Sequence, residues 1–169
     1  PYGSLITDSL YKEVIDMTSD RTFIVSDEIY RNTGFDGRVP SILDHASDSE
    51  LQRIIVTNAF SKGFRMYTAR VGFSILPTAL LEPMRVLLQH TLLTTNPCEQ
   101  FACVEALNHL EEVEELTKIY KTRNDYTVQA FEDVESVKVI SAKGGFYLVI
   151  DAVHYMTNNG IPDTYSLAE

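Results

Sequence analysis

The segment T-N-A-F-S-K-G-F-R-M-Y-T-A-R-V-G-F occupies residues 57–73 and contains a single lysine, Lys62, among small and apolar residues. Arg70 follows eight residues later. The run R-I-I-V at residues 53–56 predicts a buried strand, so Lys62 lies where a strand gives way to a turn. Partial shielding from water would weaken the preference of this lysine for its charged form and make its amine a usable nucleophile.

Helix and strand patterns alternate on the N-terminal side of this segment. Apolar residues recur with helical spacing over residues 7–19, and T-F-I-V at residues 22–25 predicts a short strand that ends at the polar sequence S-D-E-I-Y. A helix followed by an apolar strand is typical of an α/β fold with a parallel sheet. Ligands in such folds bind at the carboxyl ends of strands, so Asp27 and Lys62, each just beyond a strand, are expected near one site.

The pattern on the C-terminal side predicts one more strand and then a change of character near residue 136. The further expected elements are a strand that ends at Leu76, helices over residues 78–90, 100–110 and 111–131, strands over residues 137–140 and 146–150, and a loop over residues 158–163. The long charged helix would carry the chain from one domain into the next.

Composition limits the classes of function. Of 169 residues, 44% are hydrophobic, which is enough for a packed core. The formal net charge of −10 argues against a nucleic-acid partner, although one local cationic pocket stays open. No apolar run reaches membrane-spanning length, and the chain begins at Pro1 without a signal peptide, so we expect no membrane partner.

The cysteines and histidines predict no metal site. Cys98 and Cys103 would point to different faces of a helix, and two reduced thiols fit a cytoplasmic protein. The four histidines are scattered and lack the spacing of a zinc motif.

Four side chains match the needs of a pyridine-aldehyde cofactor. Such a cofactor requires an amine for a Schiff base, an acid to protonate its ring nitrogen, a hydroxyl near its phenolic oxygen and a cation for its phosphate. Lys62, Asp27, Tyr30 and Arg70 supply these groups in that order. Taken singly, each has an ordinary structural explanation, such as a turn cap, a core aromatic or a surface charge.

The chain resembles the fold-type I pyridoxal-phosphate enzymes, and specifically the class I/II aminotransferases. S-D-E-I-Y at residues 26–30 resembles their Asp-x-x-Tyr segment, and F-S-K-G-F-R-M-Y-T-A-R-V-G-F at residues 60–73 resembles their lysine segment. P-Y-G at residues 1–3 resembles the end of their Asn-Pro-x-Gly turn, and G-G-F-Y-L-V-I-D at residues 144–151 resembles the strand that opens their small domain.

This resemblance implies a fold and a role for each residue. Residues 1–113 would form the second half of a three-layer αβα large domain with a mostly parallel sheet. Residues 114–169 would form a linking helix and the start of an α+β small domain. Lys62 would form the Schiff base and move the substrate proton, and Asp27 would pair with the pyridinium. Tyr30 would donate to the phenolate oxygen, and Arg70 would clamp the phosphate.

Two positions depart from the family pattern. Many members carry a small hydroxyl residue three positions before the lysine, where this chain has Ala59, and a glycine two positions before the arginine, where it has Thr68. Thr57, Asn58 or Ser61 would have to compensate at the phosphate. The arginine that grips the substrate α-carboxylate in the family would fall beyond residue 169, so this chain alone is not expected to complete a catalytic site.

The resemblance implies an enzyme that transfers an amino group between an amino acid and a 2-oxo acid, and that forms a homodimer. A lyase, decarboxylase or oxidase that uses the same cofactor is the alternative that the two departures favour. A cofactor-binding effector domain of a transcription regulator and a non-catalytic relic are further alternatives. The sequence identifies no particular substrate.

Overall fold

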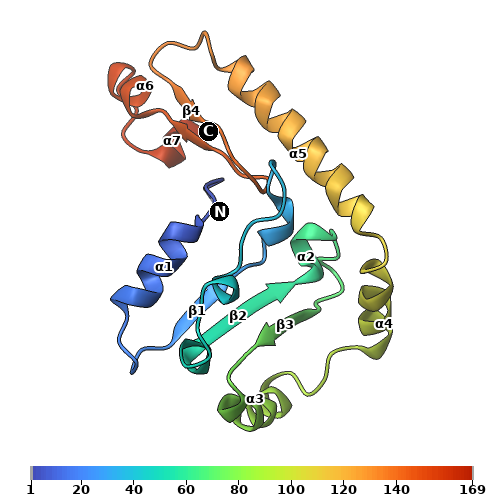
Figure 1. Cartoon of the computed structure of the whole chain (residues 1–169). Coiled ribbons are helices and arrows are strands. Elements are labelled where there is room, and N and C mark those ends of the chain that lie inside the picture. The colour runs from blue at the N-terminus through green and yellow to red at the C-terminus, as the bar shows by residue number, and fades with distance from the viewer. Residues whose placement is uncertain (1, 169) are drawn as a thin grey trace.

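A three-stranded sheet forms the centre of the chain in the computed structural model, which describes residues 2–168 (Figure 1). The strands are β1 (Ile24–Asp27), β2 (Ile54–Ala59) and β3 (Gly72–Ile75), in the order β1-β2-β3. β1 and β2 are parallel and β3 is antiparallel to β2. The expected α/β class is confirmed, and the sheet is mixed because the chain turns back directly after the lysine segment.

Helices surround this sheet. They are α1 (Asp8–Met17), the one-turn α2 (Phe60–Gly63), α3 (Thr78–Thr91), α4 (Pro97–Ala106) and the long α5 (Leu110–Ala130). Three 3₁₀ turns, η1 (Arg31–Thr33), η2 (Ile42–Asp44) and η3 (Glu50–Arg53), lie between β1 and β2. In Figure 1 α1 lies to the left of the sheet, α4 to its right, α3 below it and α5 above and to the right.

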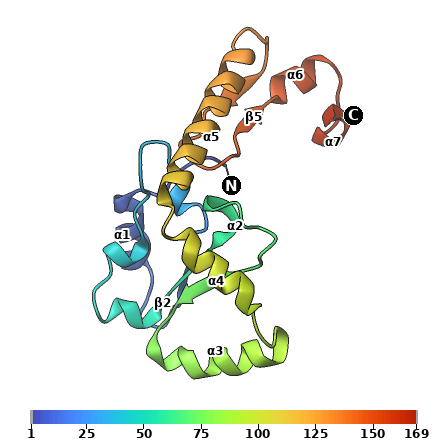
Figure 2. The same cartoon turned by 90° about the vertical axis from the view of Figure 1, so that its right-hand side faces the viewer.

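A second, two-stranded sheet follows α5. It consists of β4 (Lys138–Ile140) and β5 (Val149–Asp151), which pair antiparallel, and two short helices come after it, α6 (Val153–Asn158) and α7 (Thr164–Ala168). In Figure 2 β5, α6 and α7 extend to the upper right, away from the three-stranded sheet. The segment between β4 and β5 contacts the loop that follows β1, where Gly34 and Gly144 form an antiparallel bridge.

The helix starts follow from local chemistry. The Thr7 side chain accepts a hydrogen bond from Leu10 N at 3.3 Å and caps α1, as residues of this type do at the first turn. Pro97 occupies the first turn of α4, and the Asn96 side chain accepts from Cys98 N at 2.9 Å. α4 ends at Ala106, four residues before the expected end of this helix, and α5 begins at Leu110.

Two clusters of buried apolar side chains pack around the three-stranded sheet. Tyr11 and Ile15 of α1 pack with Ile54 and Val56 of β2 and with Ile42. The second cluster consists of Phe60, Ala69, Val71 and Cys103, so that α4 packs against both ends of the lysine segment. The loop that carries Lys62 is therefore held in place by the second apolar cluster.

The C-terminal part differs from one expectation and contains one helix that was not predicted. The strand expected over residues 146–150 is shorter, because Phe146 and Tyr147 turn toward Tyr30 and β5 starts only at Val149. Residues 153–158 form a helix that the sequence did not predict, and the Asp151 carboxylate accepts from Val153 N at its start.

The N-terminal turn is partly described. Pro1 lies outside the described residues. Gly3 has φ +76 and its carbonyl accepts from Lys143 N at 2.7 Å. A side chain at Gly3 would contact Ala142 and the Tyr147 carbonyl at 2.6 and 2.8 Å, so the position requires glycine.

Within residues 2–168 every helix is too short or too polar to cross a lipid bilayer. In the same part of the chain, no three His, Cys, Asp or Glu side chains gather as a metal ion would need.

Candidate active site

The backbone fixes the position of Lys62. β2 ends at Ala59, and residues 60–63 form the single turn of α2. Phe60 N donates to Val71 O and Met66 N donates to Phe60 O, both at 3.2 Å. These bonds close the loop that begins after β2, so the lysine is presented from a short, tied turn at the carboxyl end of a strand.

The amine of Lys62 lies against aromatic rings. Its Nζ is 5.3 Å from the centroid of the Phe146 ring and 5.9 Å from that of Tyr30. Among residues 2–168, no ion pair or hydrogen bond engages this amine. The lysine therefore has cation–π contacts but no carboxylate of its own.

Tyr30 completes this aromatic group. It precedes η1, and its ring packs edge-on against Phe146 at 5.6 Å and Tyr147 at 6.3 Å between centroids. Burial raises the pKa of the Tyr30 phenol, and the nearby Tyr147 raises it further. The phenol is thus neutral near pH 7 and can donate a hydrogen bond.

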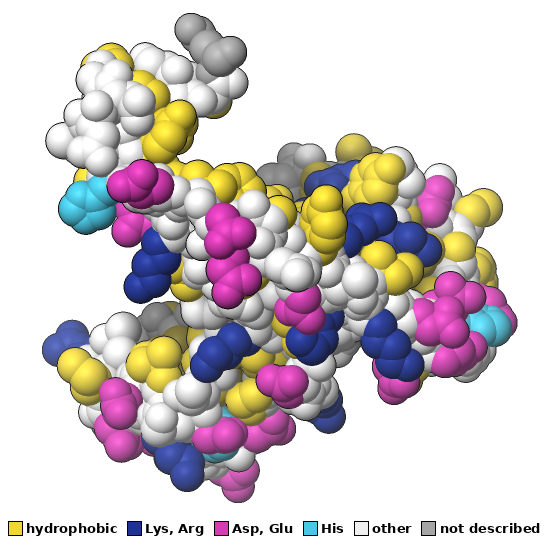
Figure 3. All heavy atoms as spheres, turned by 90° about the horizontal axis from the view of Figure 1, so that it is seen from above, with side chains coloured by type: hydrophobic (Ala, Val, Ile, Leu, Met, Phe, Trp, Pro, Cys, Tyr) yellow, Lys and Arg dark blue, Asp and Glu magenta, His cyan; other side chains and the backbone are white. Residues whose placement is uncertain are grey.

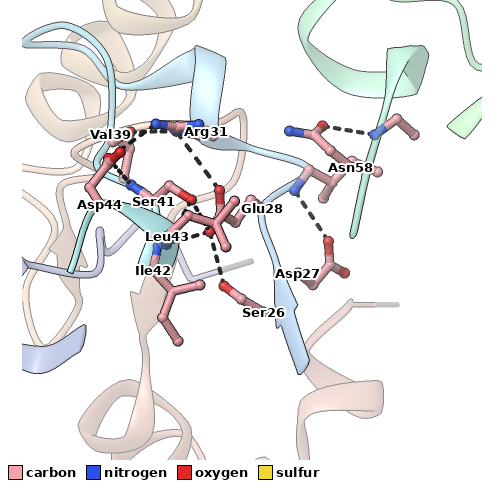
Figure 4. Close-up of polar contacts among 12 residues, drawn as sticks. Ser26, Asp27, Glu28, Arg31, Val39, Ser41, Ile42, Leu43, Asp44 and Asn58 are labelled. Carbon is pink, nitrogen blue, oxygen red and sulfur yellow. Dashed lines mark hydrogen bonds and ion pairs between the residues drawn. The ribbon is translucent and has the colours of Figure 1, made fainter. Parts of the chain in front are cut away.

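Asp27 is the last residue of β1 and pairs in register with Thr57 of β2. Its Oδ1 accepts from Ile29 N at 3.2 Å, and the carboxylate is otherwise exposed. Figure 4 shows Asp27 and the neighbouring Glu28 pointing to different sides of the strand. The carboxylate thus stands at the expected strand end, although no hydrogen bond or ion pair joins it to Lys62.

Glu28 is a buried carboxylate whose role the sequence did not reveal. Its Oε1 accepts from Ser26 Oγ at 3.2 Å, Ser41 Oγ at 2.9 Å and Ile42 N at 3.1 Å. Arg31 Nε lies 3.8 Å from the other oxygen. The sequence offered one sign of this burial. Side chains alternate between the two faces of a strand, so if Asp27 is exposed, Glu28 must point toward the interior. Glu28 thereby ties the end of β1 to η2 (Figure 4).

Arg70 lies just before β3 in a left-handed conformation, with φ +55. Non-glycine residues adopt this conformation rarely and at some cost. Its Nη1 donates to Tyr67 O at 3.1 Å, and the side chain is exposed. Of the four residues predicted from sequence, the structure therefore brings Lys62 and Tyr30 into contact, while Asp27 and Arg70 stand separately at the ends of β1 and at the start of β3.

The two departures from the family pattern fall in this loop. Ala59 precedes α2, so this turn has no side-chain cap, and its N–H donates to Asn58 Oδ1 at 2.7 Å. The Asn58 side chain is therefore engaged with the backbone, whereas Ser61 lines the cavity beside Lys62. Of the three residues expected to compensate for Ala59, Ser61 is the one that faces an open space.

That space is a cavity of about 570 Å³ between α2, α5 and the segment before β5. Aromatic rings make up much of its wall, and three basic side chains reach it: Lys62, Arg65 and Arg123. Its volume is within the range of ligand-binding pockets. Sequence reasoning missed both arginines, because Arg65 occupies a position of the lysine segment to which no role was given and Arg123 belongs to no motif.

The chain is similar to known proteins over most of its length. Residues 1–159 match the family model described as aminotransferase class I and II. The chain is 29% identical over 153 residues to an aspartate aminotransferase from Pyrococcus horikoshii, covering 88% of this chain and 38% of that protein. It is 28% identical over 165 residues to a bifunctional aspartate aminotransferase and glutamate/aspartate-prephenate aminotransferase from Petunia hybrida, covering 92% and 33%.

Solved structures give the same result. An aromatic aminotransferase from Pyrococcus horikoshii superimposes with a TM-score of 0.78 at 27% identity, covering 86% of this chain and 40% of that one. A tetra mutant of the Thermus thermophilus aspartate aminotransferase superimposes with a TM-score of 0.83 at 21% identity, covering 99% and 45%, which shows a shared fold. The chain thus spans between 33% and 45% of the length of these four proteins.

Proposed function

Because the chain belongs to the class I and II aminotransferases, a pyridoxal-phosphate-dependent family, we propose that the protein carrying it transfers an amino group from an amino acid to a 2-oxo acid. Lys62 is the residue assigned to bond with the cofactor. The observation that carries this proposal is the Lys62 amine, which lines a cavity, contacts Tyr30 and Phe146, and has no carboxylate partner among residues 2–168.

The donor set fits pyridoxal phosphate. The site offers an amine, a phenol with a raised pKa, an exposed carboxylate at a strand end and an exposed guanidinium. These are Lys62, Tyr30, Asp27 and Arg70, and the last two carry no ion pair with another described residue. Both side chains are exposed, so they are accessible to a ligand.

Each side chain then has one task. The cofactor, when bound, acts as an electron sink for charge that develops at the substrate α-carbon. Lys62 removes the α-proton and returns it, and the neutral phenol of Tyr30 donates a hydrogen bond. Asp27 keeps a ring nitrogen protonated by its negative charge, and Arg70 binds phosphate oxygens. The Phe146 ring packs beside the Lys62 amine, with its centroid 5.3 Å away.

The domain assignment remains part of the proposal. Residues 1–113 belong to the cofactor-binding domain and residues 114–169 to a linking helix and a small domain. Along the chain, α5 follows the three-stranded sheet and precedes the two-stranded one, which supports this division (Figure 1). A homodimer is proposed for the complete protein. None of the residues of α3 is buried, so this helix is free to contact a second subunit, which supports the proposal. One exposed and one buried free cysteine fit the reducing cytoplasm.

The departure at Ala59 favours one second candidate, a lyase, decarboxylase or oxidase that uses the same cofactor. Without a hydroxyl at Ala59, other side chains would hold the phosphate, and a substrate oriented differently at the site would lose a different group from its α-carbon. Product analysis separates the two candidates. Formation of a new amino acid from an added 2-oxo acid supports transfer, whereas release of carbon dioxide or ammonia supports the second candidate.

The cofactor assignment is tested by covalent trapping in the complete natural protein. We expect pyridoxal phosphate to give a visible absorption band, and borohydride to fix the cofactor on the peptide that contains Lys62. Lys62→Ala should abolish the trapped adduct and activity, whereas Lys12→Ala, on the exposed side of α1, should leave both unchanged. Turnover in the Lys62→Ala protein, or an adduct on another lysine, would contradict the assignment.

A further inference from the structure

A second cavity lies between α5 and the loop that follows η1. Its volume is about 400 Å³, which is within the range of ligand-binding pockets. The α5 residues that line it lie within 110–121, whereas those at the Lys62 cavity lie within 120–127. Among the described residues, only Phe35 lines both cavities, so its ring stands between them. The proposed function gives this second cavity no task.

Positive charge predominates at this cavity, although the formal net charge of the chain is −10. Three basic side chains line it, Arg38 from the loop and Lys118 and Lys121 from α5. Glu114 is the one carboxylate among the described residues that line it. Seen from above, the surface presents lysine and arginine side chains next to apolar ones (Figure 3). Positive charge gathered at an apolar cavity favours an anionic ligand.

Two of these three cations have no carboxylate partner. Among residues 2–168, neither Arg38 nor Lys118 takes part in an ion pair. Glu114 precedes Lys118 by four residues, a spacing that suits an ion pair on a helix, yet the two side chains do not pair. Lys121 pairs instead with Asp125, at 2.9 Å. Lys118 and Lys121 lie one turn apart and repel each other, so an anion held between them would be stabilising.

The walls of the cavity are largely apolar. Val113 and Thr117 of α5 are buried, and Thr117 Oγ1 donates to Val113 O at 2.8 Å, so this hydroxyl has a partner without a ligand. Phe35 adds an aromatic ring to the wall, and Leu110 adds an aliphatic side chain. Aromatic rings pack favourably against other flat apolar groups. The cavity therefore suits a ligand whose negative charge is attached to a ring.

Backbone hydrogen bonds shape the loop that carries Arg38. The N–H groups of Phe35 and Val39, on either side of it, donate to backbone carbonyls at 2.9 and 3.2 Å. Gly37 has φ +114, a conformation that other residues rarely adopt. The loop is thus formed before any ligand arrives, which lowers the entropic cost of binding.

We propose that this cavity binds a small organic anion with an aromatic body, such as an aromatic carboxylate, at a site separate from Lys62. The negative group contacts Arg38 and Lys118, and the ring packs beside Phe35 and Leu110. This inference goes beyond the proposed function and does not depend on it, because Lys62 does not line the cavity.

Photocrosslinking locates the site in the complete natural protein. The probe is 4-benzoylbenzoate, an aromatic carboxylate whose ketone bonds to nearby C–H groups on irradiation, and mass spectrometry maps the labelled peptides. We expect saturable labelling within residues 32–38 or 110–121. Labelling confined to other residues, such as 61–67 beside Lys62, would overturn the proposal, and so would the absence of saturable labelling.

A binding measurement tests the charge of the ligand. We expect Arg38→Gln and Lys118→Gln each to raise the dissociation constant of 4-benzoylbenzoate, measured by calorimetry, about threefold to tenfold. Arg85→Gln, an exposed change on α3, is the matched control and should leave this constant unchanged. The uncharged 4-hydroxymethylbenzophenone should label residues 32–38 and 110–121 much less than the carboxylate does.

Two results of these measurements would overturn the proposal. They are an unchanged dissociation constant in both Arg38→Gln and Lys118→Gln, and equal labelling by the charged and uncharged probes. Both side chains are exposed, so the variants should keep the wild-type thermal midpoint, and circular dichroism verifies that they are folded.

Discussion

Replacing Glu28 by alanine would remove the carboxylate that ties the end of β1 to η2. The side chain of Glu28 is 3% exposed, and one of its oxygens accepts three hydrogen bonds. Two donors are the hydroxyls of Ser26 and Ser41, which can rotate toward other acceptors. The third is the backbone N–H of Ile42, which cannot rotate and is itself in a residue only 1% exposed.

The expected loss of unfolding free energy follows from these contacts. A buried donor left without an acceptor costs about 1–3 kcal/mol, and breaking a buried charged pair costs about 3–5 kcal/mol. Arg31 keeps two other partners, because it also bonds to Val39 O at 2.9 Å and Asp44 at 3.3 Å. We therefore expect Glu28→Ala to lower the free energy of unfolding by about 3–4 kcal/mol.

Urea unfolding of the complete natural protein, followed by far-ultraviolet circular dichroism, measures this difference. Glu28→Gln keeps the shape and an accepting oxygen but loses the charge, so its expected loss is smaller, about 1–2 kcal/mol. Asp48→Asn, an exposed change in the same connection, is the control and should have little effect. A loss below about 1 kcal/mol for Glu28→Ala would refute the view that this carboxylate holds the strand end in place.

Two further predictions concern Gly144 and Tyr30. Gly144→Ala would place a methyl group 2.9 Å from Thr33 O and should loosen the bridge between Gly34 and Gly144. We expect the free energy of unfolding to fall by about 1–3 kcal/mol in the same urea assay, whereas unchanged stability would show that the bridge is dispensable. The raised pKa of Tyr30 predicts that its phenol ionises above the ordinary value of 10.0, so its contribution to stability is complete below pH 10.0 and is lost as the pH rises through the folded-state pKa. An ultraviolet titration in which Tyr30→Phe removes a tyrosinate that forms above pH 10.0 would verify this, and removal of one that forms at or below pH 10.0 would contradict it.

The elements with local signals could be predicted from sequence. Thr7 and Pro97 mark helix starts through chemistry that lies within one turn of each residue. The apolar run before Lys62 became β2, with the lysine just beyond its end, because a buried strand needs only a short continuous apolar segment. The contact between Tyr30 and Lys62 follows from the adjacency of parallel strand ends.

The features that depend on distant contacts could not be predicted. Phe146 and Tyr147 read as strand residues, but their rings pack on Tyr30, more than a hundred residues earlier, and leave the strand. Arg123 belongs to the helix expected over residues 111–131, but only the three-dimensional path of α5 brings its side chain to the cavity. Long-range packing, rather than propensity, decides both outcomes.

The reactivity of Cys103 can report whether the loop that carries Lys62 is closed or open. Its side chain is 2% exposed and packs against Phe60, Ala69 and Val71, which flank that loop, whereas Cys98 is exposed on the same helix. Burial also raises the pKa of the Cys103 thiol and suppresses the reactive thiolate. Alkylation of Cys103 therefore requires the loop to open, and its rate relative to that of Cys98 measures how often Lys62 leaves its place.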